Sequence, residues 1–392
     1  MSSTPPGSGP RGSAGPLGMI DGTMPAMQAR VEANPVADFV DYCLRGVGQV
    51  VFMNNPITGL MIVIGIFVAS AWLGVAAVIG LVASTLVGIF LGVDRTLLRA
   101  GLFGFNGVLV GAGLGLFLAP EWDGLAMIWI AVVAGFSSIL MATLATVFQT
   151  WKVPPYTLPF NFATLIFLVA GLQLANAQLG PGIGPAEVQS LGDSVETTLR
   201  SAEASASAND IEGWANAIIR GIGQLFFAND VVSGILIVVG IAVASRIAAA
   251  FALVGSAVGM LTGLALGANG IAIYNGLWGF NSFDACLAIG GVFYILSVRS
   301  AIFAVACAVA TAMLFGALVA LFTPWGLPAL TLPFCFGTLA FTIMKYSTDK
   351  LVPVEPADIT TPEGNLRRYR QERATAADEL RPAGPQAQPG SV

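Results

Sequence analysis

Residues 45–65 read RGVGQVVFMNNPITGLMIVIG, and residues 220–240 read RGIGQLFFANDVVSGILIVVG. The two stretches share the arginine, the glutamine, a phenylalanine and four glycines at matching positions. Gln49 is the fifth residue of the first stretch, and Gln224 is the fifth residue of the second. Similarity of this length within one chain indicates an internal duplication.

Two further pairs of blocks keep nearly the same distance. GFN occurs at 104–106 and again at 279–281, which is the same offset as that between the two glutamines. TLPF occurs at 157–160 and again at 331–334, an offset shorter by a single position. Because three separated blocks keep this offset so closely along the chain, we infer that the chain consists of two homologous halves.

The composition indicates an integral membrane protein. Of the 392 residues, 56% are hydrophobic and 10% are charged, whereas soluble domains average about 25% charged residues. One apolar span needs about 20 residues. Long apolar runs cover 58–92, 101–119, 124–149, 157–178, 232–267, 276–298, 300–323 and 327–344. These runs therefore predict about five membrane segments in each half, with shorter re-entrant pieces among them.

We expect an all-α membrane protein whose duplicated halves place a path at their interface, near the middle of the bilayer. An odd number of spans in each half would insert the second half upside down. Arginine and lysine in both tails favour the cytoplasmic side for the two termini.

The polar stretches divide the chain into five parts. The predicted parts are a disordered tail (1–38), a first membrane repeat (39–178), a polar linker (179–213), a second membrane repeat (214–346) and a second disordered tail (347–392).

Composition also excludes several kinds of chemistry. The chain has no histidine, which removes histidine-based triads, histidine zinc sites and paired-histidine ammonium channels. It has no phosphate-binding loop, and its net charge of −5 gives no reason to expect nucleic acid. The four cysteines are widely spaced and form no metal or disulfide pattern. We therefore expect a transporter that needs no cofactor or metal, and not an enzyme.

The repeated polar residues are the candidates for a solute path. Gln49 and Gln224 carry amides inside apolar stretches, where each forms either an interhelical hydrogen bond or a polar lining. Thr157 and Thr331 precede a proline, a pattern of helix starts that is also compatible with lining a pore. Carboxylates are few near these blocks, whereas a charged solute would need counter-charges. The pattern favours a small, neutral, planar and dipolar solute such as urea or a similar amide.

These blocks resemble the urea transporter family. The resemblance rests on GQ at 48–49 and 223–224, NPITG at 55–59, DR at 94–95, and the GFN and TLPF blocks, and it covers about residues 40–346. It implies two inverted halves, each with five spanning helices and one re-entrant pore helix. It also implies a homotrimer in the cell membrane, with one pore per subunit that conducts urea passively down its gradient.

The resemblance also assigns roles along the pore. Gln49 and Gln224 match the two outer urea sites, and Thr157 and Thr331 match the hydroxyls of the narrow central site. The expected wall residues are Val50, Phe52, Phe105, Leu109, Leu225, Phe227 and Phe280. Phe227 is placed there only as the equivalent of Phe52 in the second half.

Two positions depart from the family pattern. Asp284 stands opposite Leu109 in the duplication, where the family usually has an apolar wall residue. Its carboxyl group could narrow a urea site, bind water, or favour another amide or a guanidine-like cation. Val231 replaces the proline that the first half has at residue 56, which allows a straighter helix near one vestibule.

These departures leave rival functions open. One is a channel for short amides, ammonia or water. Another is an ion- or proton-coupled transporter that uses Asp284 or Asp230. A substrate panel separates the first rival from urea, and accumulation against a gradient identifies the second.

Overall fold

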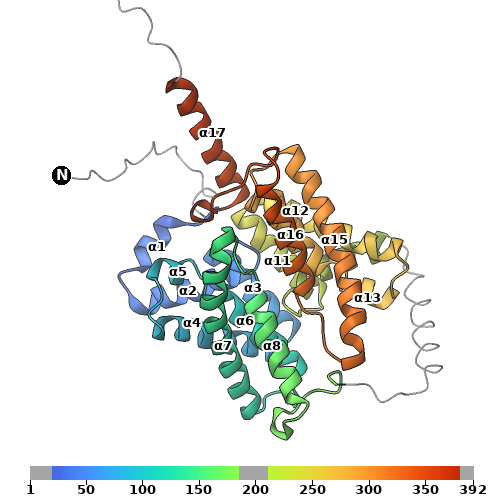
Figure 1. Ribbon diagram of the computed structural model, residues 1–392. Helices are drawn as coiled ribbons and strands as arrows, with labels where there is room; N and C mark the ends of the chain where they lie inside the picture. Colours follow the sequence, from blue (N-terminus) through green and yellow to red (C-terminus); the bar gives the residue numbers. More distant parts are fainter. Residues whose placement is uncertain (1–19, 185–210, 380–392) are drawn as a thin grey trace, which may run out of the picture.

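The computed structural model describes residues 20–184 and 211–379, and these residues are almost entirely helical (Figure 1). Most of the predicted linker lies outside the described residues. The first half comprises α1 (Pro25–Val31), α2 (Pro35–Gln49), α3 (Pro56–Ala69), α4 (Ala71–Phe90), α5 (Arg95–Arg99), α6 (Phe105–Phe117), α7 (Gly124–Phe148) and α8 (Leu158–Gly171). The second half comprises α10 (Ile211–Gln224), α11 (Val231–Ala244), α12 (Arg246–Ala265), α13 (Gly270–Tyr274), α14 (Phe280–Leu287), α15 (Val298–Phe322) and α16 (Leu332–Ile343), and α17 (Pro362–Glu379) follows it.

The duplication seen in the sequence recurs in the helix boundaries. Ser70 accepts a hydrogen bond from the first turn of α4, and Ser245, its counterpart in the second half, does the same for α12. A serine at this position satisfies a backbone N–H that has no partner within the helix. These caps divide each of the two longest apolar runs into two helices, as its length predicted.

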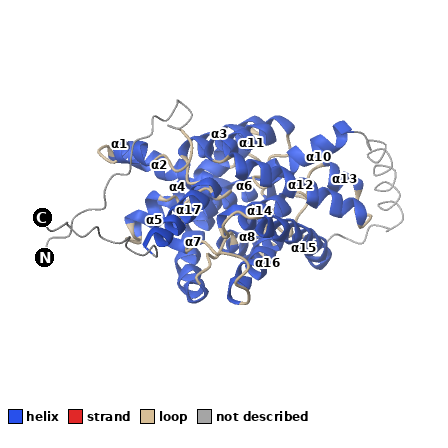
Figure 2. Ribbon diagram, turned by 90° about the horizontal axis from the view of Figure 1, so that it is seen from above, coloured by secondary structure: helices blue, strands red, loops and turns tan. Residues whose placement is uncertain are grey.

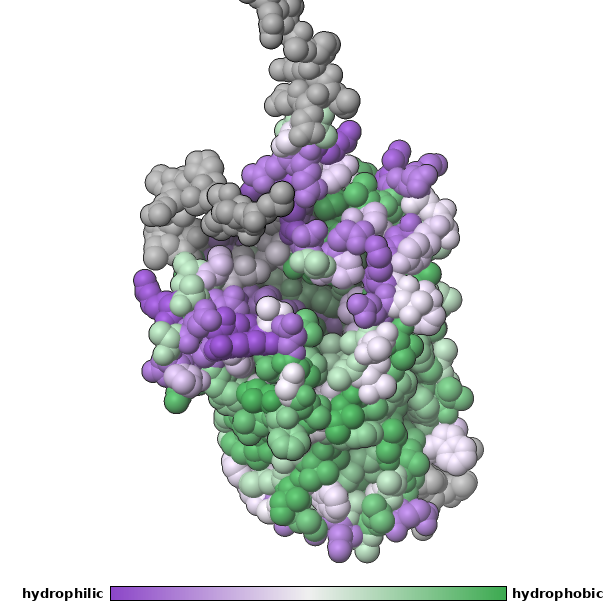
Figure 3. All heavy atoms as spheres, turned by 60° about the vertical axis from the view of Figure 1, so that its left-hand side comes forward, coloured by the Kyte–Doolittle hydropathy of each residue, from purple (hydrophilic) through white to green (hydrophobic). Residues whose placement is uncertain are grey.

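The helices of each half differ in length. Four described helical segments are long and apolar enough to span a membrane: Ala71–Phe90, Gly124–Trp151, Arg246–Ala265 and Val298–Trp325. Six further apolar helices have between 10 and 17 residues. A broad apolar surface covers the lower part of the molecule in Figure 3, and polar residues gather above it. Both observations fit a multi-pass membrane protein.

The two halves pack against each other through equivalent helices. α3 and α11 lie side by side (Figure 2), and the Thr58 hydroxyl of α3 donates to the Gly240 carbonyl of α11 at 2.7 Å. A Cβ atom on Gly65 would lie 3.2 Å from the Ser233 carbonyl oxygen, so a glycine at this position allows the close approach of the two helices. A further contact between the halves joins the Tyr156 hydroxyl to Thr342 at 2.8 Å.

The prediction of wholly disordered tails is wrong for part of each tail. α1 and the start of α2 fold before residue 39, and Asn55 donates to the backbone of Ile20 and Gly22. α17 lies within the predicted C-terminal tail and emerges from the body of the protein (Figure 1). Its polar composition suggested a solvated chain. It is anchored by polar contacts at its first turn, which a hydropathy pattern does not reveal.

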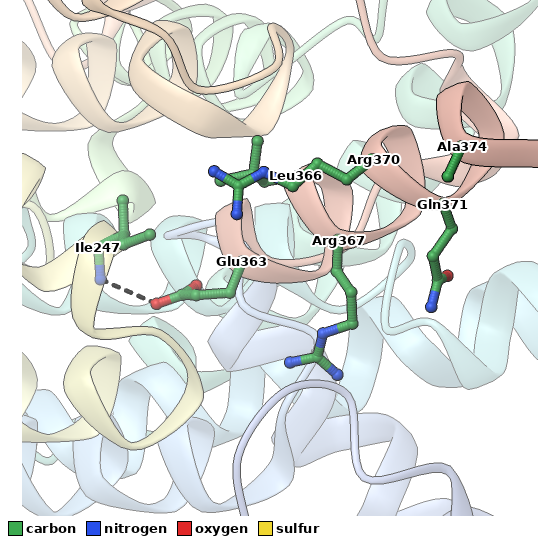
Figure 4. A pocket seen from close by; sticks show the side chains of 7 residues that line it. All are labelled: Ile247, Glu363, Leu366, Arg367, Arg370, Gln371 and Ala374. Atoms are coloured by element: carbon green, nitrogen blue, oxygen red, sulfur yellow. Dashed lines mark hydrogen bonds between the residues drawn. The ribbon is translucent and has the colours of Figure 1, made fainter. Parts of the chain in front are cut away.

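Two side chains provide that anchorage. Glu363 accepts from the Ser245 hydroxyl and from the Ile247 backbone N–H at 3.0 Å, which caps α12 (Figure 4). Asn365 donates to the carbonyls of Gly291 and Val292 at 3.0 and 3.2 Å. The start of α17 is therefore bonded to the second membrane repeat.

Val231 does not alter the start of its helix. α3 begins at Pro56 and α11 begins at Val231, and each is capped by the residue before it, Asn55 or Asp230. A proline in the first helical position gives up no hydrogen bond, because that N–H has no partner in the helix. Its replacement therefore leaves the helix boundary unchanged, and the straighter helix expected from the sequence stays a prediction.

Candidate functional site

Gln49 and Gln224 hold equivalent positions at the ends of α2 and α10. The Gln49 amide nitrogen donates to the carbonyl of Ala100 at 2.8 Å, and the Gln224 amide nitrogen donates to the carbonyl of Asn275 at 2.8 Å. Both side chains are partly buried. Because one amide N–H is anchored to the backbone, the orientation of the amide is fixed, and its oxygen remains available as an acceptor.

Glycines bring the two acceptor carbonyls within reach. Gly101 and Gly276 each follow the acceptor residue, and both adopt a φ of 77°. A Cβ atom on Gly101 would lie 2.3 Å from the Gly46 nitrogen, and one on Gly276 would lie 2.2 Å from the Gly221 nitrogen. A side chain at either position would push this turn away from α2 or α10.

The two threonines meet at the contact between the halves. Thr157 and Thr331 immediately precede α8 and α16, and their Oγ1 atoms lie 2.7 Å apart. Both residues are buried, and neither side chain caps its own helix. The sequence left open whether they merely start a helix. They start one, and their hydroxyls point at each other.

Asn161 links the threonine pair to its surroundings. Its amide nitrogen donates to the Thr331 hydroxyl and to the Thr157 carbonyl, both at 2.8 Å, and its Oδ1 accepts from the Thr331 N–H at 3.0 Å. Cys335 occupies the equivalent position in the second half, and its sulfur lies 3.2 Å from the Thr157 Oγ1. Neither residue was predicted from the sequence as a site member. Both directly follow a TLPF block, but one is an asparagine and the other a cysteine, so the duplication did not mark them.

Two more asparagines orient the starts of α8 and α16. Asn106 of the first GFN block accepts a hydrogen bond from the Phe160 N–H at 3.0 Å. Asn281 of the second block accepts from the Phe334 N–H at 3.1 Å and donates to the Leu330 carbonyl. Each GFN asparagine thus satisfies an N–H in the first turn of the helix that follows its TLPF threonine.

Aromatic rings of each half pack against rings of the other half. The Phe52 ring of the first half packs against Phe334 and Phe293 of the second, with centroid distances of 6.1 and 5.3 Å. Phe227 of the second half packs against Phe160 and Phe117 of the first, at 6.3 and 5.7 Å. The arrangement repeats with the halves exchanged.

Phe52 and Phe227 also share an unusual backbone conformation. Phe52 has a φ of 61° and Phe227 a φ of 60°. Non-glycine residues seldom adopt this left-handed conformation, and it concentrates at functional sites. Phe227 was predicted only as the counterpart of Phe52, and the structure gives the two residues the same environment.

The remaining predicted wall residues are less directly connected. Phe280 packs against Phe315 of α15 with a centroid distance of 5.7 Å. The others are buried in the same apolar core: Val50, Phe105, Leu109 and Leu225. The structure thus brings Thr157 and Thr331 together and packs Phe52 and Phe227 against the phenylalanines of the two TLPF blocks. It places the other predicted wall residues in the surrounding core.

The two carboxylates that a coupled transporter could use have different surroundings. Asp284 of α14 is fully buried, and neither of its carboxyl oxygens has a hydrogen-bond partner among the described residues. Asp230 accepts from the backbone N–H and the hydroxyl of Ser233. Asp230 is therefore engaged as a helix cap, whereas Asp284 is buried without a hydrogen-bond partner among the described residues.

A charged cluster lies outside the candidate spans, beside α1 and α5. Asp38 accepts from the Tyr42 hydroxyl at 2.6 Å and forms ion pairs with Arg95 and Arg99 at 3.1 and 3.4 Å. Burial alone would raise the pKa of Asp38, but the hydrogen bond from Tyr42 and the two guanidinium groups outweigh it and hold that pKa below its usual value. Asp38 thus ties α5 to α2, near the carbonyl that anchors Gln49.

The open groove in Figure 4 is a separate feature. It has a volume of about 460 Å³ and lies between the start of α12 and α17. Ile247, Glu363 and three residues of the next turns, Leu366, Arg367 and Arg370, contribute to its lining. It contains none of the predicted pore residues.

The site therefore belongs to a duplicated helical membrane protein, with a polar pair at the contact of its halves, aromatic rings beside it and an anchored amide in each half. A model of the urea transporter family matches residues 40–346, and the chain belongs to that family. Urea transporter 1 of Ovis aries is 32% identical to this chain over 373 residues, which are 94% of this chain and 93% of the sheep protein. Urea transporter 1 of Rattus norvegicus is 30% identical over 364 residues, 92% of each chain.

Proposed function

We propose that this protein lets urea cross the cell membrane passively, along a path between its two halves. Membership of the urea transporter family supports a transporter of urea rather than an enzyme. The observation that carries the proposed path is the meeting of Thr157 and Thr331, 2.7 Å apart, at equivalent helix starts of opposite halves. Equivalent helix starts that meet between repeats are the expected position of a transport site.

The surroundings of the threonine pair suit a planar amide. Urea has N–H groups that need acceptors and a carbonyl that needs donors, and a threonine hydroxyl is both. Gln49 and Gln224 supply further acceptor oxygens, and Phe52 and Phe227 offer flat apolar faces. Such groups replace hydration without binding the solute so tightly that it cannot leave. Urea entering the centre must displace the hydrogen bond between the two threonines.

The finer architecture follows from the duplication and the family. We propose that the halves are inverted, with five spanning helices and one re-entrant pore helix each, and that both termini are cytoplasmic. Exposed apolar residues on the surface, including Leu60, Ile64 and Phe67, would contact lipid or a neighbouring subunit. A homotrimer with one path per subunit is part of the proposal.

Stopped-flow light scattering on proteoliposomes tests this function. We expect faster urea flux than in empty vesicles, with no accumulation against a gradient and no response to a proton ionophore. Lys350→Ala, an exposed change outside the site, serves as the matched control. Urea flux equal to that of empty vesicles contradicts the proposal, and accumulation that collapses with the ionophore indicates coupled transport. Parallel measurements with acetamide, methylammonium and water separate urea from the other solutes.

A further inference from the structure

The burial of Asp284 is not compensated by any hydrogen bond to its carboxyl group among the described residues. Asp284 lies on α14 with a relative exposure of 0%, and both of its carboxyl oxygens lack hydrogen-bond partners within the described part of the chain. A buried carboxyl group without partners is costly, because the water that it loses is not replaced. Leu109, its counterpart in the first half, is equally buried but makes no such demand.

Asp284 lies near residues of the proposed path. Asn281 stands three residues earlier on the same helix face, and its side chain bonds to Leu330 and Phe334, on either side of Thr331. The Asp284 carboxyl group is also close enough to Cys335 to interact with it electrostatically. The Cys335 sulfur in turn contacts Thr157, so Cys335 connects Asp284 to the threonine pair.

The helix that carries Asp284 has a second departure from the first half. A π-helical turn, Ala288–Val292, follows α14 directly. Phe280 is the counterpart of Phe105, at the same offset as the two glutamines. Phe293 packs on Phe52 as Phe117 packs on Phe227, so Phe293 is the counterpart of Phe117. The offset between Phe117 and Phe293 is one residue longer than that between the glutamines. The second half therefore accommodates one extra residue in this helix. Such turns occur frequently at functional sites.

We propose that Asp284 is a two-oxygen acceptor site for planar solutes with two parallel N–H groups, and that it binds guanidinium more tightly than urea. This inference rests on the proposed function and adds a selectivity to it. Two free carboxyl oxygens match two parallel N–H donors, and a cationic partner strengthens both hydrogen bonds. The flat rings that suit urea also suit guanidinium, which has nearly the same shape. Acetamide has a single NH₂ group and cannot form the pair of bonds.

A divalent metal ion fits the site less well. Such ions require about six oxygen ligands. Within residues 20–184 and 211–379, no group of three metal-binding side chains occurs. The Cys335 thiol, which interacts electrostatically with Asp284, is a soft ligand that Mg²⁺ or Ca²⁺ does not favour.

Competition with urea flux tests the inference. Proteoliposomes carrying the full chain are assayed for urea flux with increasing guanidinium, and with tetramethylammonium as a cation that has no N–H group. We expect guanidinium to inhibit urea flux and tetramethylammonium not to. Asp284→Asn keeps the shape but loses the charge and one acceptor, and should raise the half-inhibiting guanidinium concentration by about tenfold or more. Asp284→Leu copies the residue of the first half and should act in the same direction.

The outcomes separate the inference from the proposed function. Urea flux without inhibition by guanidinium, or with equal inhibition by both cations, overturns the inference and leaves the function standing. The same inhibition in Asp284→Asn as in the original protein also overturns it. Absence of any urea flux contradicts the function itself. If Asp284→Leu does not fold, Asp284→Asn and the comparison of the two cations still decide.

Discussion

Replacing the two central threonines with valine tests the path quantitatively. Thr157→Val and Thr331→Val keep the branched shape and remove the hydroxyl from a pair 2.7 Å apart. Each change leaves one urea group without a partner, at a cost of about 2 kcal/mol. Each also removes the hydrogen bond between the threonines, which urea otherwise has to break, and that returns about 1 kcal/mol. The net rise of the barrier is about 1 kcal/mol, so each variant should conduct urea roughly fivefold more slowly.

The double variant separates direct contact from independent effects. Two urea groups then lack partners, but the single hydrogen bond between the threonines is lost only once. The barrier should therefore rise by about 3 kcal/mol, which corresponds to roughly 150-fold slower flux. Independent hydroxyls would give about 2 kcal/mol and roughly 30-fold.

The assay is stopped-flow urea flux, normalised to the amount of folded protein in each vesicle preparation. Asn161 still donates to the Thr157 carbonyl in every variant, so part of the central network remains. Single variants with unchanged flux would refute the assignment of the hydroxyls to the path. A double variant that is merely additive would show that the two hydroxyls do not meet during conduction.

Three further predictions concern other parts of the molecule. Gln49→Leu and Gln224→Leu each remove a hydrogen-bond acceptor and a hydrogen bond to the backbone. Each variant should conduct urea about fivefold more slowly, which corresponds to about 1 kcal/mol. Equal flux in both variants and in the original protein would argue against a role of the two glutamines in the path. Gly80→Ala places a Cβ atom 2.2 Å from a backbone carbonyl oxygen of α6 and should destabilise the protein by about 1–3 kcal/mol. The destabilisation should be measured as a lower Tm in detergent. Gly124→Ala is the control, because the space around Gly124 is open and Tm should not change. The pKa of Asp38 is lowered in the folded protein, so its stabilising effect is present above a pH of about 4 and is lost as the pH falls through the folded-state pKa. On acidification, Tm should therefore drop less steeply in Asp38→Asn than in the original protein.

The residues that the sequence singled out are those that repeat, and their place on a solute path stays a prediction. Gln49 with Gln224, and Thr157 with Thr331, were found because a polar residue in an apolar stretch is conspicuous when it occurs twice at one offset. Their helix starts followed from proline and the preceding residue. The family resemblance is confirmed by the match over residues 40–346.

The features that the sequence did not predict depend on the backbone or break the repeat. The carbonyls that anchor the two glutamines belong to Ala100 and Asn275, whose side chains give no hint of this role. Asn161 has a cysteine as its counterpart, so the repeat pattern did not mark it. α17 is highly polar, and its attachment depends on two side chains bonding to a helix start and a helix end elsewhere.

The most direct test of a path through the threonine pair uses Cys335, whose sulfur lies 3.2 Å from the Thr157 Oγ1. The protein in proteoliposomes is treated with a small methylthiolating reagent, labelling of each cysteine is followed by mass spectrometry, and urea flux is measured on the same samples. We expect flux to fall in proportion to the labelling of Cys335, urea to slow that labelling, and Cys335→Ala to conduct urea after the same treatment. Unchanged flux with Cys335 fully labelled, or equal inhibition in Cys335→Ala, would contradict a path at this position.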